Sequence, residues 1–335
     1  MNPGVHSQEL SPKIVARIEA LGLFHLRLRL QTRSALRLPD IAGPTLRGAF
    51  GNALFRQSCP FPEPRCASCE WVSDCAYGRT FETPQAALGA GIQQVRFANP
   101  PRPMWLRWES PPRSGEAPGQ ELSLSVLGTR AARRFLPEVV RAVEGLAANG
   151  LGRERSQLDL IAVEDVAGVP VVSIPAAPAL AQVRTWRAVG AADPRSVLLR
   201  TLSPLRLHRD GHLLADPNAA DVAAAAWRRL ALLELANESA GDPRENDRLH
   251  RDAILEMARA SDGGSLGDLR MLRRHSGRSG RRQAFLGFEG DILFVDAPAA
   301  LCTLLEAGVQ TGIGKGIAFG FGSYALVPWT RGARS

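Results

Sequence analysis

The chain contains one order of predicted strands and helices twice, and this internal repeat constrains its fold more than any other feature. In the first half, GLFHLRLRLQ (22–31) alternates apolar and polar residues as a half-buried strand does, and a helix is predicted at 43–57. In the second half, a predicted strand at 196–207 again precedes a helix-forming segment. Each half also carries a Gly-x-Gly-basic segment between a helix and a strand, at 150–153 and at 312–315. The repeat predicts an α+β protein with two tandem ferredoxin-like domains, each an RRM-like βαββαβ unit.

The predicted domain limits follow from this repeat. We expect an N-terminal ferredoxin-like domain at residues 1–165, a linker at 166–195 and a C-terminal ferredoxin-like domain at 196–335. A chain of 335 residues that is 45% hydrophobic can form two cores. The first residues lack the apolar segment of a secretory signal peptide, and no run of about 18 apolar residues appears. We therefore expect a cytoplasmic protein without a membrane partner.

The charge of the chain favours an anionic partner. Its formal net charge is +8, and Lys13 and Lys315 are the only lysines among 41 basic residues, so the others are arginines. Arginine forms forked hydrogen bonds with phosphates and stacks on bases, which makes RNA or DNA a candidate partner. The segment DLRMLRRHSGRSGRRQ (268–283) carries six arginines and cannot pack into a core. We interpret it either as an RNA-binding segment or as a basic loop without fixed structure.

Four cysteines lie close together in CPFPEPRCASCEWVSDC (59–75), with the spacing Cys59-x6-Cys66-x2-Cys69-x5-Cys75. A reducing compartment disfavours disulfides, whereas four thiolates around a Cys-x2-Cys pair suit a tetrahedral metal ion. We predict a small metal-binding loop inserted in the first domain, with structural zinc as the expected metal. An iron–sulfur cluster and a loop without metal are the alternatives. Cys302 lies in an apolar segment and is expected to be buried.

A cluster of glycines lies near the C-terminus, in GIGKGIAFGFG (312–322). It is not a P-loop, because Val309 stands in place of the first glycine and Gly316, not Ser or Thr, follows Lys315. A dinucleotide-binding turn needs a further helix and strand, and only 13 residues follow Gly322. Two interpretations stay open. The backbone amides and Lys315 could contact a phosphate backbone, or the glycines could serve the turns and bulges of a tight hairpin.

The glycine cluster resembles the C-terminal glycine-rich loop of the RAMP superfamily, and GIGKGIAFGFGSY is similar to its form in CRISPR precursor-crRNA processing endoribonucleases. Four further segments are similar to blocks of that family, in the same order: LRGAFGNALFR (46–56) with the cysteine segment after it, NGLGRERSQLDL (149–160), SPLRLHRDGHL (203–213) and RRHSGRSGRRQAFLGFEGDI (273–292). The resemblance implies two ferredoxin-like domains, with the RAMP domain C-terminal. It implies CRISPR repeat RNA, as a crRNA stem-loop, for the substrate, and other CRISPR effector subunits as further partners. It also implies cleavage by the RNA 2′-hydroxyl that needs no metal and leaves a 2′,3′-cyclic phosphate.

The candidate RNA-binding residues come from these segments and from the two Gly-x-Gly-basic elements. They are Arg47, Arg153, Arg270, Arg273, Arg274, Arg278, Arg281, Arg282, Gly312, Gly314, Lys315, Gly316, Gly320 and Gly322.

The catalytic histidines are less evident from the motifs. Members of the resembled family often carry histidine where Asn52 stands here, and some carry it in place of Gly312. Asparagine cannot transfer protons, so the acid and base must lie elsewhere. We predict His275, among the arginines, and His25, which shares a strand face with Arg27 and Arg29. His208 and His212 flank Arg209-Asp210-Gly211, and we interpret them as polar residues of a hairpin turn.

Three functions fit the sequence. The first is an endoribonuclease that cuts CRISPR repeat RNA. The second is a non-cleaving RNA-binding subunit of a CRISPR effector complex, which Asn52 favours. The third is a metal-cluster scaffold or redox protein in which the cysteines are the functional centre.

Overall fold

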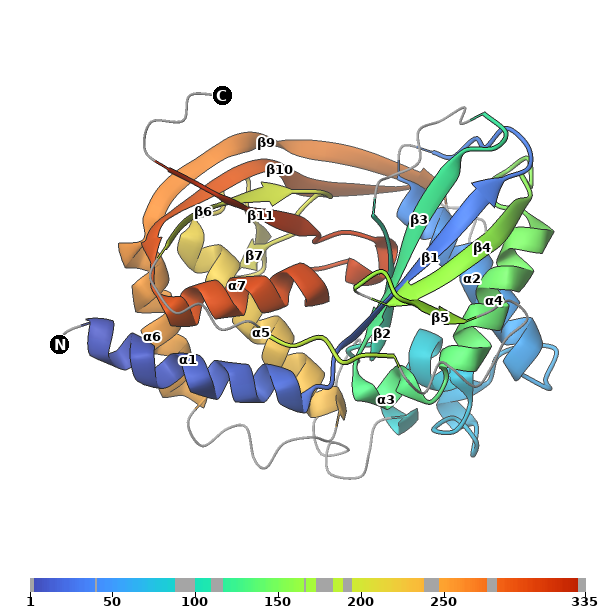
Figure 1. The fold of residues 1–335 in the computed structure, drawn as a ribbon, viewed down its shortest axis with the longest axis horizontal. Helices are drawn as coiled ribbons and strands as arrows, with labels where there is room; N and C mark the ends of the chain where they lie inside the picture. The colour runs from blue at the N-terminus through green and yellow to red at the C-terminus, as the bar shows by residue number, and fades with distance from the viewer. Residues whose placement is uncertain are drawn as a thin grey trace.

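The computed structural model describes residues 3–39, 41–87, 100–109, 117–165, 167–172, 183–188, 195–237, 247–275 and 282–330. They form two main antiparallel sheets, each with helices packed against it, that lie side by side (Figure 1). Among these residues, no helix is long and apolar enough to cross a membrane.

The first sheet is built around the alternating segment near residue 25. Its strands are β1 (Phe24–Thr32), β2 (Met104–Trp108), β3 (Glu121–Gly128), β4 (Leu158–Asp165) and β5 (Pro170–Val172), in the order β2-β3-β1-β4-β5. Leu26, Leu28 and Leu30 of β1 are fully buried. They form one core with α2 (Ala42–Ser58) and α4 (Leu136–Asn149), while the short α3 (Arg130–Arg133) precedes α4. The alternate residues of β1 therefore face the other side of the sheet.

The second sheet has the order β11-β6-β10-β9. Its strands are β6 (Arg195–Thr201), β9 (Asp262–His275), β10 (Arg282–Ala297) and β11 (Tyr324–Pro328), and its helices are α5 (Ala219–Asn237), α6 (Asp247–Ala260) and α7 (Ala299–Thr311). A small hairpin, β7 (His208–Arg209) and β8 (His212–Leu213), lies between β6 and α5.

Both sheets have ferredoxin-like topology. In the first sheet β4 pairs with β1, β1 with β3 and β3 with β2; in the second sheet β11 pairs with β6, β6 with β10 and β10 with β9. Strand β5 is an addition at the edge of the first sheet. The predicted fold class, two tandem ferredoxin-like domains, is confirmed. The four-cysteine segment lies where it was predicted, after α2 and before the helical turn η2 (Tyr77–Glu82) of the first half.

The N-terminal helix departs from the predicted domain limits. Helix α1 (Pro3–Ala20) precedes the first sheet in sequence but packs against α7, and Leu10, Ile14 and Ile18 lie in the core of the second half (Figure 1). The apolar face of α1 is therefore buried by the C-terminal helices. The domain limits 1–165, 166–195 and 196–335 stay a prediction.

Three strands were not foreseen from the sequence, and one of them, β5, lies in the segment predicted as a linker, 166–195. Strand β2 lies in a proline-rich segment, where Trp105 and Leu106 pair with Leu127 and Val126 of β3. Strand β9 includes the start of the basic segment, and its backbone pairs with β10 from Asp262 to His275. The interpretation of this part as a loop is wrong, because pairing between the strands, not a buried face, gives it structure.

Candidate nucleic-acid interface

The glycine cluster forms a compact loop between α7 and β11. Gly312, Gly314, Gly316, Gly320 and Gly322 all have left-handed backbone angles, with φ between +66° and +87°. At Gly322 a Cβ atom would lie 2.1 Å from the carbonyl oxygen of Ile313, whose own N–H donates to the Gly322 carbonyl at 3.0 Å. The loop is thus closed on itself, and side chains at these positions would be strained.

Two backbone hydrogen bonds fix the loop beside the chain that leaves β6. The Lys315 N–H donates to the Arg206 carbonyl at 3.0 Å, and the Gly322 N–H donates to the Pro204 carbonyl at 3.1 Å. On its other side the loop touches the start of α2, since a Cβ atom on Gly43 would lie 2.1 Å from the Phe319 carbonyl oxygen. The loop therefore joins the two halves and places Lys315 near Arg206.

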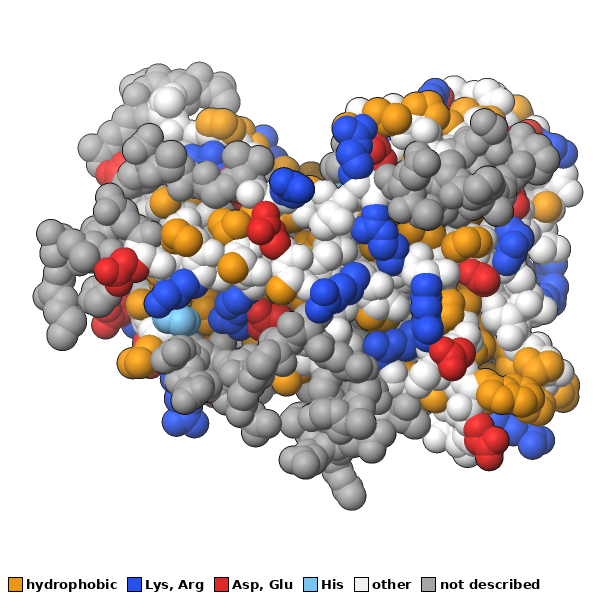
Figure 2. Space-filling view, turned by 60° about the horizontal axis from the view of Figure 1, so that its bottom comes forward, with side chains coloured by type: hydrophobic (Ala, Val, Ile, Leu, Met, Phe, Trp, Pro, Cys, Tyr) orange, Lys and Arg blue, Asp and Glu red, His pale blue; other side chains and the backbone are white. Residues whose placement is uncertain are grey.

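A cleft of about 660 Å³ opens beside this loop. Its walls come from residues 100–105 of the first half and from β7, α5 and the glycine loop of the second half. Its ionisable lining residues are Arg102, Arg206, His208, Arg209, Asp210, Asp221, Arg228, Arg229, Arg251 and Lys315. Figure 2 shows a face of the molecule on which Lys and Arg side chains gather where the two halves meet.

Arg229 is the most deeply buried cation of the cleft. Its guanidinium lies 4.7 Å from the ring centroid of Trp105, and its Nε donates to the Thr311 carbonyl at 3.2 Å. Burial, together with the nearby charge of Arg102, lowers the pKa of Arg229 to about 9. Among the described residues, no carboxylate contributes to this shift. A buried cation without a carboxylate favours an anionic ligand.

Arg206 and Arg102 are also held by carbonyl oxygens. Arg206 Nε donates to the Leu286 carbonyl at 3.0 Å, and Arg102 Nε donates to the Phe81 carbonyl at 2.7 Å. Burial lowers the pKa of both guanidinium groups, and the charge of Glu82 partly opposes this at Arg102. By contrast, Arg209 is paired with Asp221 at 3.0 Å. The cleft therefore carries an excess of positive charge suited to phosphate.

His208 lies in this cleft, at the first position of β7. Its Nδ1 is 3.2 Å from the Arg206 carbonyl oxygen. Burial lowers the pKa of His208, the hydrogen bond to Arg206 opposes this, and the charges of Lys315, Arg206 and Arg228 lower the pKa further. The sequence pattern predicts the hairpin that contains His208 but indicates no role for this residue, because two of its three cationic neighbours, Lys315 and Arg228, are remote in sequence.

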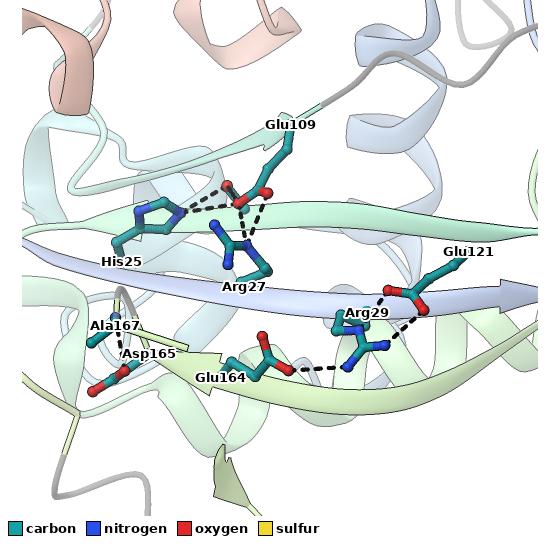
Figure 3. Close-up of polar contacts among 9 residues, drawn as sticks. His25, Arg27, Arg29, Glu109, Glu121, Glu164, Asp165 and Ala167 are labelled. Atoms are coloured by element: carbon teal, nitrogen blue, oxygen red, sulfur yellow. Dashed lines mark hydrogen bonds and ion pairs between the residues drawn. The ribbon is translucent and has the colours of Figure 1, made fainter. Parts of the chain in front are cut away.

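His25 lies elsewhere, on the side of the first sheet opposite Leu26, Leu28 and Leu30 (Figure 3). Its side chain is largely buried, with Nε2 2.8 Å from Ser125 Oγ and 3.6 Å from Glu109 Oε1. Arg27 Nε contacts both oxygens of Glu109 at 2.9 Å. The nearby His25 ring, and then Arg27 and Ser125, lower the pKa of Glu109 to about 2 against the opposing effect of burial. His25 thus belongs to a polar cluster on the sheet and does not line the cleft.

The arginines of this sheet face are paired with acids. Arg29 Nη2 donates to Glu121 at 2.7 Å, and Arg29 Nη1 donates to Glu164 at 3.3 Å (Figure 3). Since Arg27 is paired with Glu109, the positive charges of β1 are offset by carboxylates. This face attracts an anion less than the cleft does.

The other predicted RNA-binding residues are dispersed. Gly314, Lys315 and Gly316 line the cleft. Arg47 lies near it, with its guanidinium 3.9 Å from the ring centroid of Phe81 and 5.8 Å from that of Phe319. Arg153 is exposed in a turn after α4, and Arg270 is paired with Glu289 at 2.8 Å.

The rest of the predicted basic segment is described only in part. The backbones of Arg273, Arg274 and His275 belong to β9, and His275 pairs with Arg282 of β10. Residues 276–281, and with them Arg278 and Arg281, lie outside the described residues. The roles predicted for these side chains, including catalysis by His275, stay predictions.

Cys59, Cys66, Cys69 and Cys75 line one pocket of about 260 Å³, together with Phe61 and Trp71. All four are free thiols. Burial, then Glu82, then the three other cysteines raise the pKa of Cys66 to about 11. As the side chains are placed, no group of three or more possible ligands in the described part of the chain could hold a metal ion. The predicted zinc therefore stays a prediction. Cys302 is fully buried, as expected.

Comparisons with known proteins give two family models and a set of similar structures. Residues 199–324 match the model of the CRISPR-associated endoribonuclease Cas6, and residues 21–179 match a model described as an N-terminal domain. No protein with a curated description matches the chain.

Three solved structures show how similar the fold is. A Cas6 product complex has a TM-score of 0.52 at 17% identity, covering 91% of this chain and 100% of that chain. Thermus thermophilus Cas6 has a TM-score of 0.52 at 15% identity, covering 91% of this chain and 98% of that chain. A partial Cas6-RT-Cas1–Cas2 complex has a TM-score of 0.52 at 13% identity, covering 93% of this chain and 47% of that chain. At these identities the likeness concerns the fold alone.

Proposed function

We propose that this chain is a Cas6-type protein of the RAMP superfamily that binds CRISPR repeat RNA and cuts it as an endoribonuclease. The family match lies over the second half, which supplies most of the cleft. The proposal rests on three cations of the cleft, Arg206, Arg229 and Lys315. Among the described residues, no contact pairs any of the three with a carboxylate. Such a cleft between two domains can hold the phosphates of a single RNA strand.

We propose that the cut requires no metal ion. The RNA 2′-hydroxyl attacks the adjacent phosphorus, and the products are a 2′,3′-cyclic phosphate and a 5′-hydroxyl. This reaction needs a base for the hydroxyl proton, cations near the phosphate and a proton for the leaving oxygen. The arginines and Lys315 of the cleft supply the cations. The reaction would take place in the cytoplasm, where repeat transcripts are made.

A second candidate function is binding without cleavage, as the RNA-holding subunit of a larger CRISPR assembly. Asn52 favours it, because this residue lies exposed on α2 and cannot transfer a proton. One structure with a similar fold is described as a partial Cas6-RT-Cas1–Cas2 complex, so assembly with other CRISPR proteins is part of this alternative.

The test is cleavage of the repeat RNA from the protein's own genome in the presence of EDTA. We expect one cut, and no cut in an RNA that carries a 2′-deoxy residue at that position. Tight binding without a cut in either RNA would contradict the endonuclease and favour the binding subunit. A cut that EDTA abolishes would contradict the metal-independent mechanism alone.

We also propose that the four cysteines hold a structural zinc ion. The support is that all four thiols line one pocket in a loop with little regular structure. Their side chains must converge to bind it, since their present arrangement does not form a site.

Elemental analysis of the purified protein should give about one zinc per chain. C66S and C69S should each remove it and lower the melting temperature, whereas C302S, in α7, should keep it. A protein without metal at normal stability would contradict the proposal, and a brown protein would indicate an iron–sulfur cluster.

A further inference from the structure

We propose that His208 is the general base that takes the proton from the RNA 2′-hydroxyl. This inference rests on the proposed endoribonuclease function and assigns its proton acceptor to a residue outside the predicted pair, His25 and His275. It starts from the position of His208 in the cleft, beside the glycine loop.

The backbone around His208 is firmly held. Leu205 and Leu207 are buried in the core of the second half, and Leu205 exchanges two 2.8 Å backbone hydrogen bonds with Phe288 of β10. After His208 the chain turns at Asp210 and Gly211, which have φ of +50° and +85°, and returns as β8. The imidazole therefore projects from a rigid hairpin, as a group that must meet one atom of a substrate requires.

The hydrogen bond of His208 fixes its tautomer. Nδ1 lies 3.2 Å from the Arg206 carbonyl oxygen. A carbonyl oxygen only accepts hydrogen bonds, so Nδ1 carries the proton. In the neutral ring Nε2 then has a free lone pair, which is the form a general base needs.

The charges around the ring keep it neutral. Lys315 approaches from the glycine loop, Arg206 from the chain after β6 and Arg228 from α5. On the hairpin itself, Arg209 is paired with Asp221 of α5, and Asp210 occupies the turn. Burial and the three cations oppose protonation of the imidazole. The same cations can stabilise the charge that develops on the phosphate.

The proposed step balances as follows. Nε2 of His208 takes the 2′-hydroxyl proton while the 2′-oxygen forms a bond to phosphorus. The bond from phosphorus to the 5′-oxygen breaks, and that oxygen takes a proton from a water molecule. The imidazolium then returns its proton to the resulting hydroxide, so the net products are the 2′,3′-cyclic phosphate and the 5′-hydroxyl.

The test uses H208N, whose side-chain amide can still donate to the Arg206 carbonyl but cannot accept a proton. H212N is the matched control, because His212 lies exposed on the facing strand of the hairpin and does not line the cleft. Single-turnover cleavage of the repeat RNA by H208N should be roughly 10²–10⁴ times slower than by the wild type. The dissociation constant for the 2′-deoxy RNA should change less than about twofold, since the charges remain. H212N should match the wild type in both.

The pH profile gives an independent measurement. The wild-type rate should rise with pH and level off with an apparent pKa below the 6.5 of an ordinary histidine, and H208N should lose this step. If H208N does not fold, a wild-type profile without such a step overturns the assignment. Equal rates for H208N and the wild type would overturn it too and leave the endoribonuclease standing. A wild-type protein that binds but never cuts would instead overturn the proposed function.

Discussion

At the scale of single residues, arginines in this protein differ by their partners. Arg27 and Arg29 on the first sheet contact carboxylates, so their charge is offset within the fold. Arg206 and Arg229 in the cleft donate to carbonyl oxygens and lie over aromatic rings. The total charge of +8 is therefore a poor guide to where an anion binds, and the partners of each arginine are a better one.

The residue-scale prediction concerns Glu109. Its pKa is lowered from 4.5 to about 2 in the fold, so its ionised form stabilises the protein above pH 4.5 and this contribution is lost as the pH falls toward 2. Glu109→Gln should lower the free energy of unfolding by ~1–3 kcal/mol at pH 7, since charged hydrogen bonds to Arg27 and Ser125 are lost. Urea unfolding of both proteins between pH 7 and pH 3 measures the difference, which should shrink below pH 4.5.

The matched control is Glu121→Gln on the same sheet. Glu121 is paired with Arg29 but its side chain is 44% exposed, so the free energy of unfolding should change much less than in Glu109→Gln. If the effect of Glu109→Gln were the same at pH 3 as at pH 7, the polar cluster around His25 would not depend on this carboxylate.

At the scale of elements, the contact between α2 and the glycine loop holds the site together. A Cβ atom on Gly43 would lie 2.1 Å from the Phe319 carbonyl oxygen, and backbone atoms cannot turn aside as a side chain can. Gly43→Ala should push the loop away and lower the free energy of unfolding by ~1–3 kcal/mol, as overpacking does. It should also slow cleavage, because Lys315 belongs to the displaced loop.

Gly48, on the same helix, is the matched control. It is exposed and a Cβ atom there would meet nothing within 4 Å, so Gly48→Ala should be neutral or stabilise by up to about 1 kcal/mol. Denaturant unfolding and cleavage rates measure both variants. Equal stability of the two would mean that the loop tolerates displacement from α2.

The elements that the sequence predicts well are those with a local signal. Strand β1 alternates over Leu26, Leu28 and Leu30, and the apolar segment of α7 is long enough for a helix. The sequence does not predict strand β2, because prolines, including Pro103, precede it and because pairing with β3 stabilises it. The sequence does not predict strand β9 either, because the strand contains Gly263, Gly264 and Gly267 and glycine is rare in strands.

The parts of the candidate site also differ in whether the local sequence predicts them. The glycine loop carries its own signal, because left-handed backbone at five positions requires glycine. His208 has no such signal, since only Arg206 among its three cationic neighbours is close in sequence, while Arg228 and Lys315 are 20 and 107 residues away. The loop is a set of glycine-dependent turns and also forms one wall of the cleft, and its contact with a phosphate backbone stays a prediction.

At the scale of the whole molecule, the two halves are interlocked. Helix α1 lies in the core of the second half, Arg107 of β2 donates to the Val309 carbonyl of α7 at 2.8 Å, and the C-terminal loop rests on α2. The cleft has walls from both halves, so its width depends on how they are held. Neither half alone would make the site.

The prediction at this scale is that the cleft, and not the overall positive charge, sets the salt dependence of RNA binding. Each cation that meets a phosphate contributes to the slope of log K against log salt concentration, by up to about one unit. Arg228→Gln and Lys315→Gln, in the cleft, should each reduce this slope by roughly 0.7–0.9 and weaken binding of the 2′-deoxy repeat RNA. Arg29→Gln removes the same charge from the molecule but from a position between Glu121 and Glu164, so the slope should stay unchanged. Fluorescence anisotropy titrations from low to moderate salt would measure all three variants against the wild type. An equal loss of slope in all three variants would mean that RNA binding depends on the net charge of the protein. It would contradict the cleft as the binding site.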